Sequence, residues 1–134
     1  MITNEIELKM PSGVMDTFII HPDENGPFPI ILFLMDAPGK REELHDMASR
    51  IATCGYYVML PNLYYRKTRD FIFEPTSAGR TKMLEQISWS TFLTGSATFL
   101  SLLSGKCKTS NLFIFSVFIG FKEFGKLFKF PNNA

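Results

Sequence analysis

The residues that could attack a carbonyl group or move a proton are few in this chain of 134 residues. Its two cysteines, Cys54 and Cys107, show neither a C-x-x-C motif nor metal-ligand spacing, so they predict no disulfide framework and no metal site. Lysines flank Cys107 and would favour its thiolate, but the simpler interpretation is a surface thiol. Cys54 falls in the last turn of a predicted helix, where we expect a packing role. The two histidines, His21 and His45, are interpreted as a strand-end residue and a solvated helix residue.

Two apolar runs and a helix between them are the elements that would position a site. Residues 30–35 and 56–60 are continuously apolar, which is typical of parallel strands buried on both faces of a sheet. Between the runs, apolar residues recur at three- and four-residue spacing from Arg41 to Cys54, which predicts an amphipathic helix, and Gly55 supplies its C-terminal stop. The order strand, helix, strand predicts a βαβ unit.

The segment before this unit predicts a hairpin. Apolar residues alternate loosely over residues 5–8 and 14–20, on both sides of the turn sequence Pro-Ser-Gly at residues 11–13. Residues 21–27 contain two prolines, a glycine and two acids, which indicates a surface loop. The elements predicted after the unit are two capped helices at about residues 76–88 and 90–103, a third buried parallel strand at residues 111–119, and a helix or disordered end at residues 121–130. We therefore expect an α/β fold with a mostly parallel sheet, an N-terminal antiparallel hairpin and flanking helices.

Composition and charge argue against several classes of function. Fourteen basic and 13 acidic residues give a formal net charge of +1, which offers no electrostatic case for binding nucleic acid. The N-terminus lacks a basic region followed by an apolar stretch, so a cytoplasmic location is the default expectation. Residues 86–105 are twenty uncharged residues, but eight of them are serine or threonine, so a soluble core is favoured over a membrane span. The last 24 residues hold seven of the 14 phenylalanines, which suggests a different origin or environment for this tail.

The most specific motifs lie around the predicted βαβ unit. Met-Asp-Ala-Pro-Gly at residues 35–39, and Gly-Tyr-Tyr-Val-Met-Leu-Pro-Asn-Leu-Tyr-Tyr-Arg at residues 55–66, resemble the first βαβ crossover of the dienelactone hydrolase family of α/β-hydrolases. With residues 1–22 and the helix before Ser104, the resemblance covers roughly the first hundred residues. It implies hydrolysis of ester or lactone bonds through a covalent acyl-enzyme. It also implies a partial α/β-hydrolase fold, because the complete fold usually needs about 200 residues or more.

The resemblance assigns a nucleophile position that holds no nucleophile. An α/β-hydrolase carries its nucleophile in a strand-to-helix elbow, G-x-[SC]-x-G, followed along the chain by an acid and then a histidine. Placing residues 111–115 on the family's nucleophile strand puts Ser-Val-Phe-Ile-Gly-Phe, residues 116–121, on the elbow, with Phe118 in the nucleophile position. Both His21 and His45 precede this point. No complete triad can be assembled in the family's order, so we expect negligible hydrolysis by this chain.

The resemblance also implies supporting residues. It gives Ala37 the backbone N–H of an oxyanion hole, and it places Asp36 where the family has a glutamate that contacts the resting thiol. An alternative for Asp36 is an acid that caps the following helix. Tyr65 and Arg66, with their neighbour Tyr64, match the family's loop beside the active-site cleft. Arg80 is a candidate for the arginine that binds a substrate carboxylate, and its alternative is a solvated side chain.

Three hypotheses follow for the whole chain. The first divides it into residues 1–110, the N-terminal part of a dienelactone-hydrolase-like domain, and residues 111–134, a divergent apolar and basic tail in place of the elbow. Its expected partner is a small-molecule ester or lactone, with no cofactor, no metal and no nucleic acid. The second is a non-catalytic interaction protein or homodimer in which the aromatic tail covers an exposed sheet edge. The third is a peripheral membrane protein anchored through residues 121–130.

Overall fold

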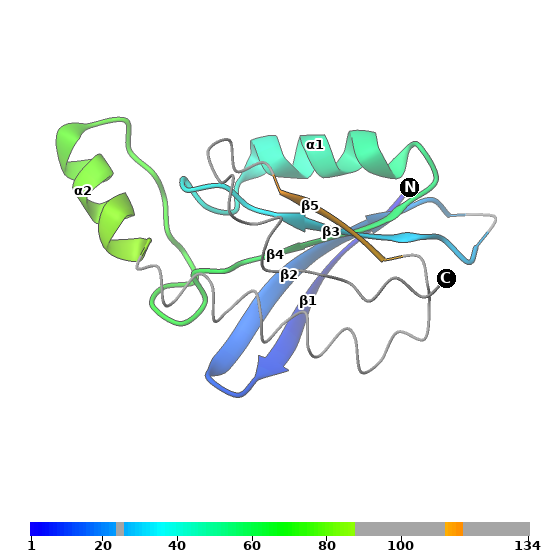
Figure 1. The fold of residues 1–134 in the computed structure, drawn as a ribbon, viewed down its shortest axis with the longest axis horizontal. Coiled ribbons are helices and arrows are strands. Elements are labelled where there is room, and N and C mark those ends of the chain that lie inside the picture. The colour runs from blue at the N-terminus through cyan, green and yellow to red at the C-terminus, as the bar shows by residue number, and fades with distance from the viewer. Residues whose placement is uncertain (24–25, 88–111, 117–134) are drawn as a thin grey trace, which may run out of the picture.

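The fold is a single mixed sheet with a helix packed on one face. The computed structural model describes residues 1–23, 26–87 and 112–116, the last as a backbone strand. The elements in chain order are β1 (Ile2–Met10), β2 (Gly13–His21), β3 (Ile30–Leu34), α1 (Glu42–Ala52), β4 (Tyr57–Pro61), α2 (Ser77–Gln86) and β5 (Leu112–Ser116). The strands lie in the order β1-β2-β4-β3-β5 (Figure 1).

The predicted hairpin is confirmed. β1 and β2 pair antiparallel from Ile2↔His21 to Met10↔Gly13, so the chain turns through Pro11 and Ser12. β2 also pairs antiparallel with β4, from Thr17↔Pro61 to Ile20↔Val58. Two of the four strand pairings are therefore antiparallel and two are parallel, so the expectation of a mostly parallel sheet is not supported. The antiparallel pairing of β2 with β4 accounts for this departure from the prediction. Pairing between strands that are distant in sequence cannot be recognised from the local pattern of either strand.

The predicted βαβ unit is confirmed, and it forms the middle of the sheet. β3 runs parallel to β4 on one side and to β5 on the other. α1 covers one face and packs against β2 and β4 (Figure 1). Its side chains Leu44, Ala48 and Ala52 recur every four residues and are fully buried, as an amphipathic helix on a sheet requires. Gly55 follows with φ of 92°, a conformation that glycine adopts at low cost and that ends the helix.

The core lies between α1 and the sheet and along the central strands. The buried hydrophobic residues that contact one another come from the hairpin, the central strands, α1 and the segment after β4; they are Met10, Met15, Ile19, Ile20, Leu32, Phe33, Leu34, Met35, Leu44, Ala48, Ala52, Val58, Met59, Leu60, Leu63, Tyr64 and Tyr65. The apolar runs at residues 30–35 and 56–60 thus contain the strands β3 and β4, which are largely buried. At roughly 1.5 to 3 kcal/mol for each large buried side chain, this cluster is the main stabilising feature of the described fold.

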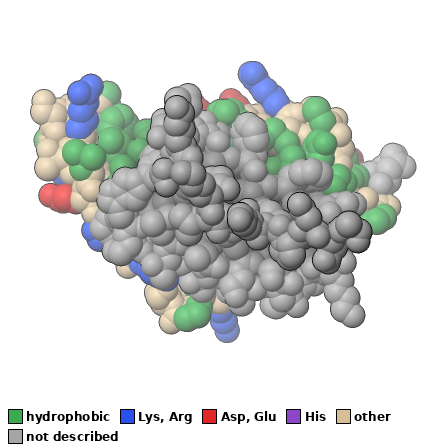
Figure 2. Space-filling model, viewed as in Figure 1, with side chains coloured by type: hydrophobic (Ala, Val, Ile, Leu, Met, Phe, Trp, Pro, Cys, Tyr) green, Lys and Arg blue, Asp and Glu red, His purple; other side chains and the backbone are tan. Residues whose placement is uncertain are grey.

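The second described helix lies away from the sheet. The side chain of Thr76 accepts a hydrogen bond from the backbone N–H of Gly79 at 3.0 Å, which caps α2 where the sequence predicted a cap. Only Gly79 is buried in α2, and the helix stands apart from the strands (Figure 1). Figure 2 shows hydrophobic, basic and acidic side chains next to one another over α2. The face of α2 seen in Figure 2 is therefore chemically mixed.

The third predicted parallel strand is confirmed in its pairing. β5 lies beside β3 with the register Ile30↔Leu112 to Leu34↔Ser116. The helix predicted at residues 90–103 and the helix or disordered end predicted at residues 121–130 lie outside the described residues. No helix within residues 1–23, 26–87 and 112–116 is long and apolar enough to cross a membrane.

Candidate functional site

The loop after β3 carries the first group of candidate residues. The backbone N–H of Gly39 donates to the carbonyl oxygen of Asp36 at 3.0 Å, which closes a tight turn. Gly39 has φ of 90°, where a side chain would be strained. The guanidinium of Arg41 binds both carboxylate oxygens of Asp36 and donates to the Gly39 carbonyl at 3.0 Å. The hydrogen bonds to the Asp36 carboxylate and the charge of that carboxylate raise the pKa of Arg41 above its usual value.

These contacts bear on the interpretation of Asp36 as an acid that caps the following helix. The N-cap position of α1 is Arg41, and no side chain caps the helix there. The capping hypothesis for Asp36 is therefore wrong, because the carboxylate is held by the Arg41 guanidinium instead. Bidentate pairs of this kind fix both groups in one plane. Asp36 thus contributes to the shape of the loop.

Tyr64 reaches this loop from the segment after β4. Its hydroxyl donates to the Ala37 carbonyl at 2.6 Å, and its side chain is 3% exposed. Burial and the nearby charge of Asp36 raise the pKa of Tyr64 to about 12. The hydroxyl is therefore a proton donor over the whole physiological pH range. Within the described part of the chain, no acceptor is assigned to the backbone N–H of Ala37.

The register of β5 sets the end of that strand beside the end of β3, from which this loop leaves the sheet. Ser116 at the end of β5 lies opposite Leu34 at the end of β3, in a parallel pair. Because the carboxyl ends of parallel strands meet at one edge of a sheet, the chain leaves both strands on the same side. Ala37 follows Leu34 by three residues, and Phe118 follows Ser116 by two. The elbow residues 117–121 themselves lie outside the described residues, so the assignment of Phe118 stays a prediction.

The predicted substrate-binding residues do not form one cluster in the described part of the chain. The hydroxyl of Tyr65 lies 3.1 Å from Oγ of Ser12, at the hairpin turn. Arg66 donates from Nε to the same hydroxyl at 3.2 Å, and its guanidinium carbon lies 5.7 Å from the centre of the Tyr65 ring. Arg80 is exposed on α2, away from the sheet (Figure 1). Tyr65 and Arg66 thus contact each other, whereas Arg80 lies on a different element, α2.

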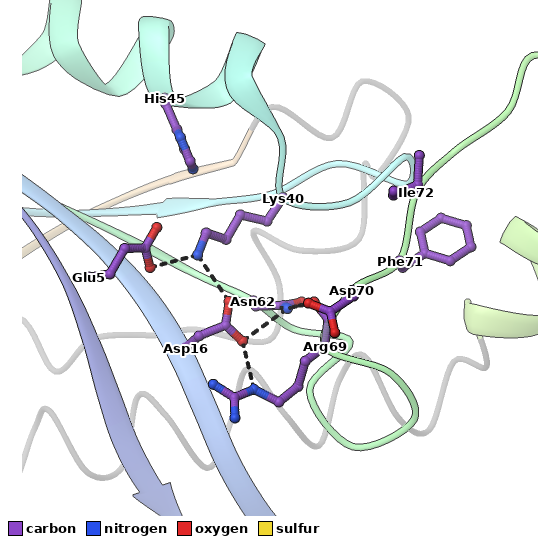
Figure 3. Close-up of a pocket in the computed structure, with 9 residues that line it drawn as sticks. All are labelled: Glu5, Asp16, Lys40, His45, Asn62, Arg69, Asp70, Phe71 and Ile72. Atoms are coloured by element: carbon purple, nitrogen blue, oxygen red, sulfur yellow. Dashed lines mark hydrogen bonds and ion pairs between the residues drawn. The ribbon is translucent and has the colours of Figure 1, made fainter.

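The structure brings together a second group of charged residues that sequence reasoning missed. Asp16 on β2 accepts hydrogen bonds from Nζ of Lys40 at 2.9 Å and from Nδ2 of Asn62 at 3.1 Å, and Nε of Arg69 lies 3.6 Å away (Figure 3). Lys40 also binds Glu5 at 2.8 Å. Burial alone would raise the pKa of Asp16, but the hydrogen bonds and charge of its neighbours outweigh burial and hold that pKa below 3.8.

This charged group lines an open pocket of about 310 Å³. Asp16 and Glu5 come from the hairpin, Lys40 and His45 from the start of the α1 region, and the rest from the segment after β4; those are Asn62, Arg69, Asp70, Phe71 and Ile72 (Figure 3). A sequence signal for Asp16 does exist. It stands in a strand between Met15 and Thr17 and shares a strand face with Phe18, where an acid needs a partner.

His45 and Cys54 differ from the sequence expectations. His45 points from α1 toward the pocket and stacks on Phe18, with ring centres 4.1 Å apart (Figure 3). Its Nε2 is buried without a hydrogen-bond partner in the described part of the chain, and burial and the charge of Lys40 lower its pKa. The prediction of a solvated His45 is therefore wrong. Cys54 is exposed, because α1 ends at Ala52, so its predicted packing role is also wrong.

Among the residues that the structure describes, no group of three or more histidine, cysteine, aspartate or glutamate side chains could hold a metal ion. The arrangement at the end of β3 offers a different kind of chemistry. A backbone N–H in a loop fixed by hydrogen bonds can stabilise negative charge on an oxygen atom.

Comparisons with known proteins identify relatives of this arrangement. A family model described as "Dienelactone hydrolase family" matches residues 15–103. A protein named "Putative carboxymethylenebutenolidase" from Methylorubrum extorquens is 36% identical over 67 residues, which are 50% of this chain and 23% of that protein. A protein of the same name from Yersinia pestis is 32% identical over 54 residues, which are 40% of this chain and 20% of that protein.

A solved structure shares the fold. The crystal structure named "Putative Dienelactone Hydrolase" from Klebsiella pneumoniae superposes with a TM-score of 0.69 at 20% sequence identity. The match covers 86% of this chain and 49% of that chain. The chain therefore corresponds to about half of the solved structure, and its matched segments to about a quarter or less of the two curated relatives.

Proposed function

The chain belongs to the dienelactone hydrolase family, and on that premise we propose that it forms the oxyanion side of an ester or lactone hydrolase site. The substrate would be a small-molecule ester or lactone. The boundary is proposed near residue 110, where residues 1–110 carry the family's N-terminal elements. Residues 111–134 stand in the place of the nucleophile elbow.

The observation that carries this proposal is the loop from Asp36 to Gly39 at the end of β3. Ester hydrolysis passes through a tetrahedral intermediate, in which the carbonyl oxygen gains a negative charge. Ala37 follows the end of β3, and the end of β3 pairs with the end of β5, after which the family's nucleophile would follow. Removing one such donor from a hydrolase typically costs about a hundredfold to a thousandfold in turnover. The loop thus supplies one half of the proposed catalytic centre.

Asp36 takes a supporting role in this proposal. Both of its carboxylate oxygens are bound by Arg41, so they are occupied in shaping the loop. The family's glutamate at this position is one methylene longer than aspartate. We therefore assign Asp36 to the loop scaffold and leave the stabilisation of charge to the Ala37 N–H. Tyr65 and Arg66 are proposed to border the substrate, and Arg80 is proposed as a more distant carboxylate contact.

We also propose that the 134 residues do not hydrolyse esters by themselves. They contain no G-x-[SC]-x-G sequence, and Phe118 in the nucleophile position has no atom that can attack a carbonyl carbon. Both histidines precede that position, whereas the fold places its general base after it. Without a nucleophile and a general base, a backbone donor supports only the small residual rate of attack by water.

The test is hydrolysis of a chromogenic short-chain ester by the purified chain, beside Cys54→Ser and Cys107→Ser variants. We expect no turnover above the buffer rate for any of the three. Turnover that only Cys107→Ser removes would overturn the proposal and identify Cys107 as the nucleophile. Turnover that survives both substitutions would equally overturn it and point to a nucleophile other than cysteine.

A further inference from the structure

We propose that Tyr64 is a positioning residue that fixes the direction of the Ala37 N–H. This inference rests on the proposed function, because the N–H has a role only as an oxyanion donor. The Tyr64 hydroxyl donates to the Ala37 carbonyl at 2.6 Å, across 27 positions of sequence. This hydrogen bond ties the segment after β4 to the loop after β3.

The Ala37 N–H lies in one peptide plane, and the next peptide plane restrains it through the torsion angles of Ala37. The first joins Asp36 to Ala37, and its carbonyl oxygen accepts from the Gly39 N–H at 3.0 Å. In a trans peptide the N–H points opposite to that carbonyl, so this bond sets where the Ala37 N–H points. The second plane joins Ala37 to Pro38, and Tyr64 holds its carbonyl oxygen. With both planes held, the torsion angles of Ala37 are fixed.

The aromatic ring of Tyr64 adds a second restraint on the same turn. A Cβ built on Gly39 would lie 3.3 Å from the nearest ring atom, so the ring lies directly against the turn. Phe71 packs edge-on against Tyr64, with ring centres 5.5 Å apart. The ring is thereby held between the turn and Phe71, which aims its hydroxyl at Ala37.

Asn62 holds the backbone of Tyr64 in turn. Its Oδ1 accepts from the Tyr64 N–H at 3.1 Å. Its Nδ2 donates to Asp16 at 3.1 Å and to the Arg69 carbonyl at 2.8 Å. Asn62 is 4% exposed, so these bonds are shielded from water. The chain of contacts therefore runs from β2 through Asn62 and Tyr64 to the loop.

The test removes the hydroxyl alone with Tyr64→Phe in the full chain and compares it with Tyr57→Phe. Tyr57 is the matched control, because its half-buried ring stacks on His21 at 5.0 Å, a contact outside the loop. Two readouts report on the turn: the hydrogen-exchange rate of the Gly39 amide and the ¹³C chemical shift of the Ala37 carbonyl. The amides of the β2–β4 ladder report the stability of the core.

In Tyr64→Phe we expect exchange of the Gly39 amide to rise roughly fivefold, as the loss of one hydrogen bond predicts. The Ala37 carbonyl shift should move, while the ladder amides and the Tyr57→Phe chain keep their wild-type values. An unchanged Gly39 rate and Ala37 shift would overturn the inference. An equal rise in all core amides would also overturn it, since it would show a merely structural role. The ester assay decides the proposed function separately, because its outcome does not depend on these exchange rates.

Discussion

Replacing Asp16 with asparagine should destabilise the fold at neutral pH while keeping the shape of the side chain. Asp16 accepts from Lys40 at 2.9 Å and from Asn62 at 3.1 Å, and Arg69 lies 3.6 Å away. An amide in its place offers one oxygen acceptor and no charge. Lys40 would then keep only Glu5 as a charged partner, at 2.8 Å.

The expected magnitude lies between two limits. Exposed ion pairs contribute up to about 1 kcal/mol, whereas removing one partner of a fully buried pair costs about 3 to 5 kcal/mol. The side chains of Asp16 and Lys40 are 20% and 12% exposed, which is closer to the buried limit. Because Glu5 still compensates part of the Lys40 charge, we expect a loss of about 2 kcal/mol.

Urea denaturation of the wild-type chain and Asp16→Asn at pH 7 would measure this loss. Glu5→Gln is the matched control, because Glu5 binds the same Lys40 from a side chain that is 52% exposed. We expect that control to lose less than about 1 kcal/mol. If Asp16→Asn costs no more than Glu5→Gln, the role assigned to Asp16 is refuted.

The loss should also depend on pH in a defined direction. The folded state holds the pKa of Asp16 below the ordinary value of 3.8, so the ionised form stabilises the fold. That contribution is present above the ordinary pKa and disappears as the pH falls through the lower folded pKa. The difference between the wild-type chain and Asp16→Asn should be constant near pH 7 and shrink below pH 3.8. A difference that grows in acid would contradict the assignment.

Three further experiments test the loop after β3, the packing of α1 and the environment of Tyr64. Gly39→Ala should cost about 1 to 3 kcal/mol in thermal unfolding, because φ is 90° and a Cβ would meet the Tyr64 ring at 3.3 Å; no loss would refute this. Leu44→Ala, at a fully buried site, should cost about 2 to 5 kcal/mol, and Met47→Ala, at 38% exposure on the same helix, less than about 1 kcal/mol. An ultraviolet titration should show one tyrosine that ionises near pH 12, and Tyr64→Phe should remove it. The free energy of unfolding should fall as the pH rises from 10.0 to about 12, because the protonated hydroxyl stabilises the fold. A titration without that high-pH tyrosine would contradict the hydroxyl contact.

The local elements could be predicted because each depends on a short-range pattern. Alternation around Pro11 and Ser12 indicated the hairpin, and four-residue spacing from Leu44 indicated α1. Thr76 as a cap and Gly55 as a stop follow from single residues with a known preference. The mixed arrangement of the sheet could not be predicted from such local patterns, because β2 and β4 pair although they are far apart in sequence.

The candidate site was predictable only in part. The resemblance placed Asp36 and Ala37 after a central strand, and the structure has them there. It gave no indication of the partners of these residues. His45 was expected to be a solvated helix residue, whereas its ring stacks on Phe18 of a different element. Tyr64 was named only as a neighbour in the loop motif, and its contact with Ala37 appeared only in the folded chain.

The sequence by itself determined the periodicity of the strands and of α1, the turn residues and the family motif, because these features are properties of neighbouring residues. The tertiary structure decided which side chains meet. Tyr64 reaches Ala37 across 27 positions, and Asn62 reaches Asp16 across 46. Such contacts depend on strand order and register, to which every part of the sheet contributes at once. The position of the proposed oxyanion loop after β3 therefore follows from the sequence motif, whereas the contacts that fix its conformation follow from the tertiary structure.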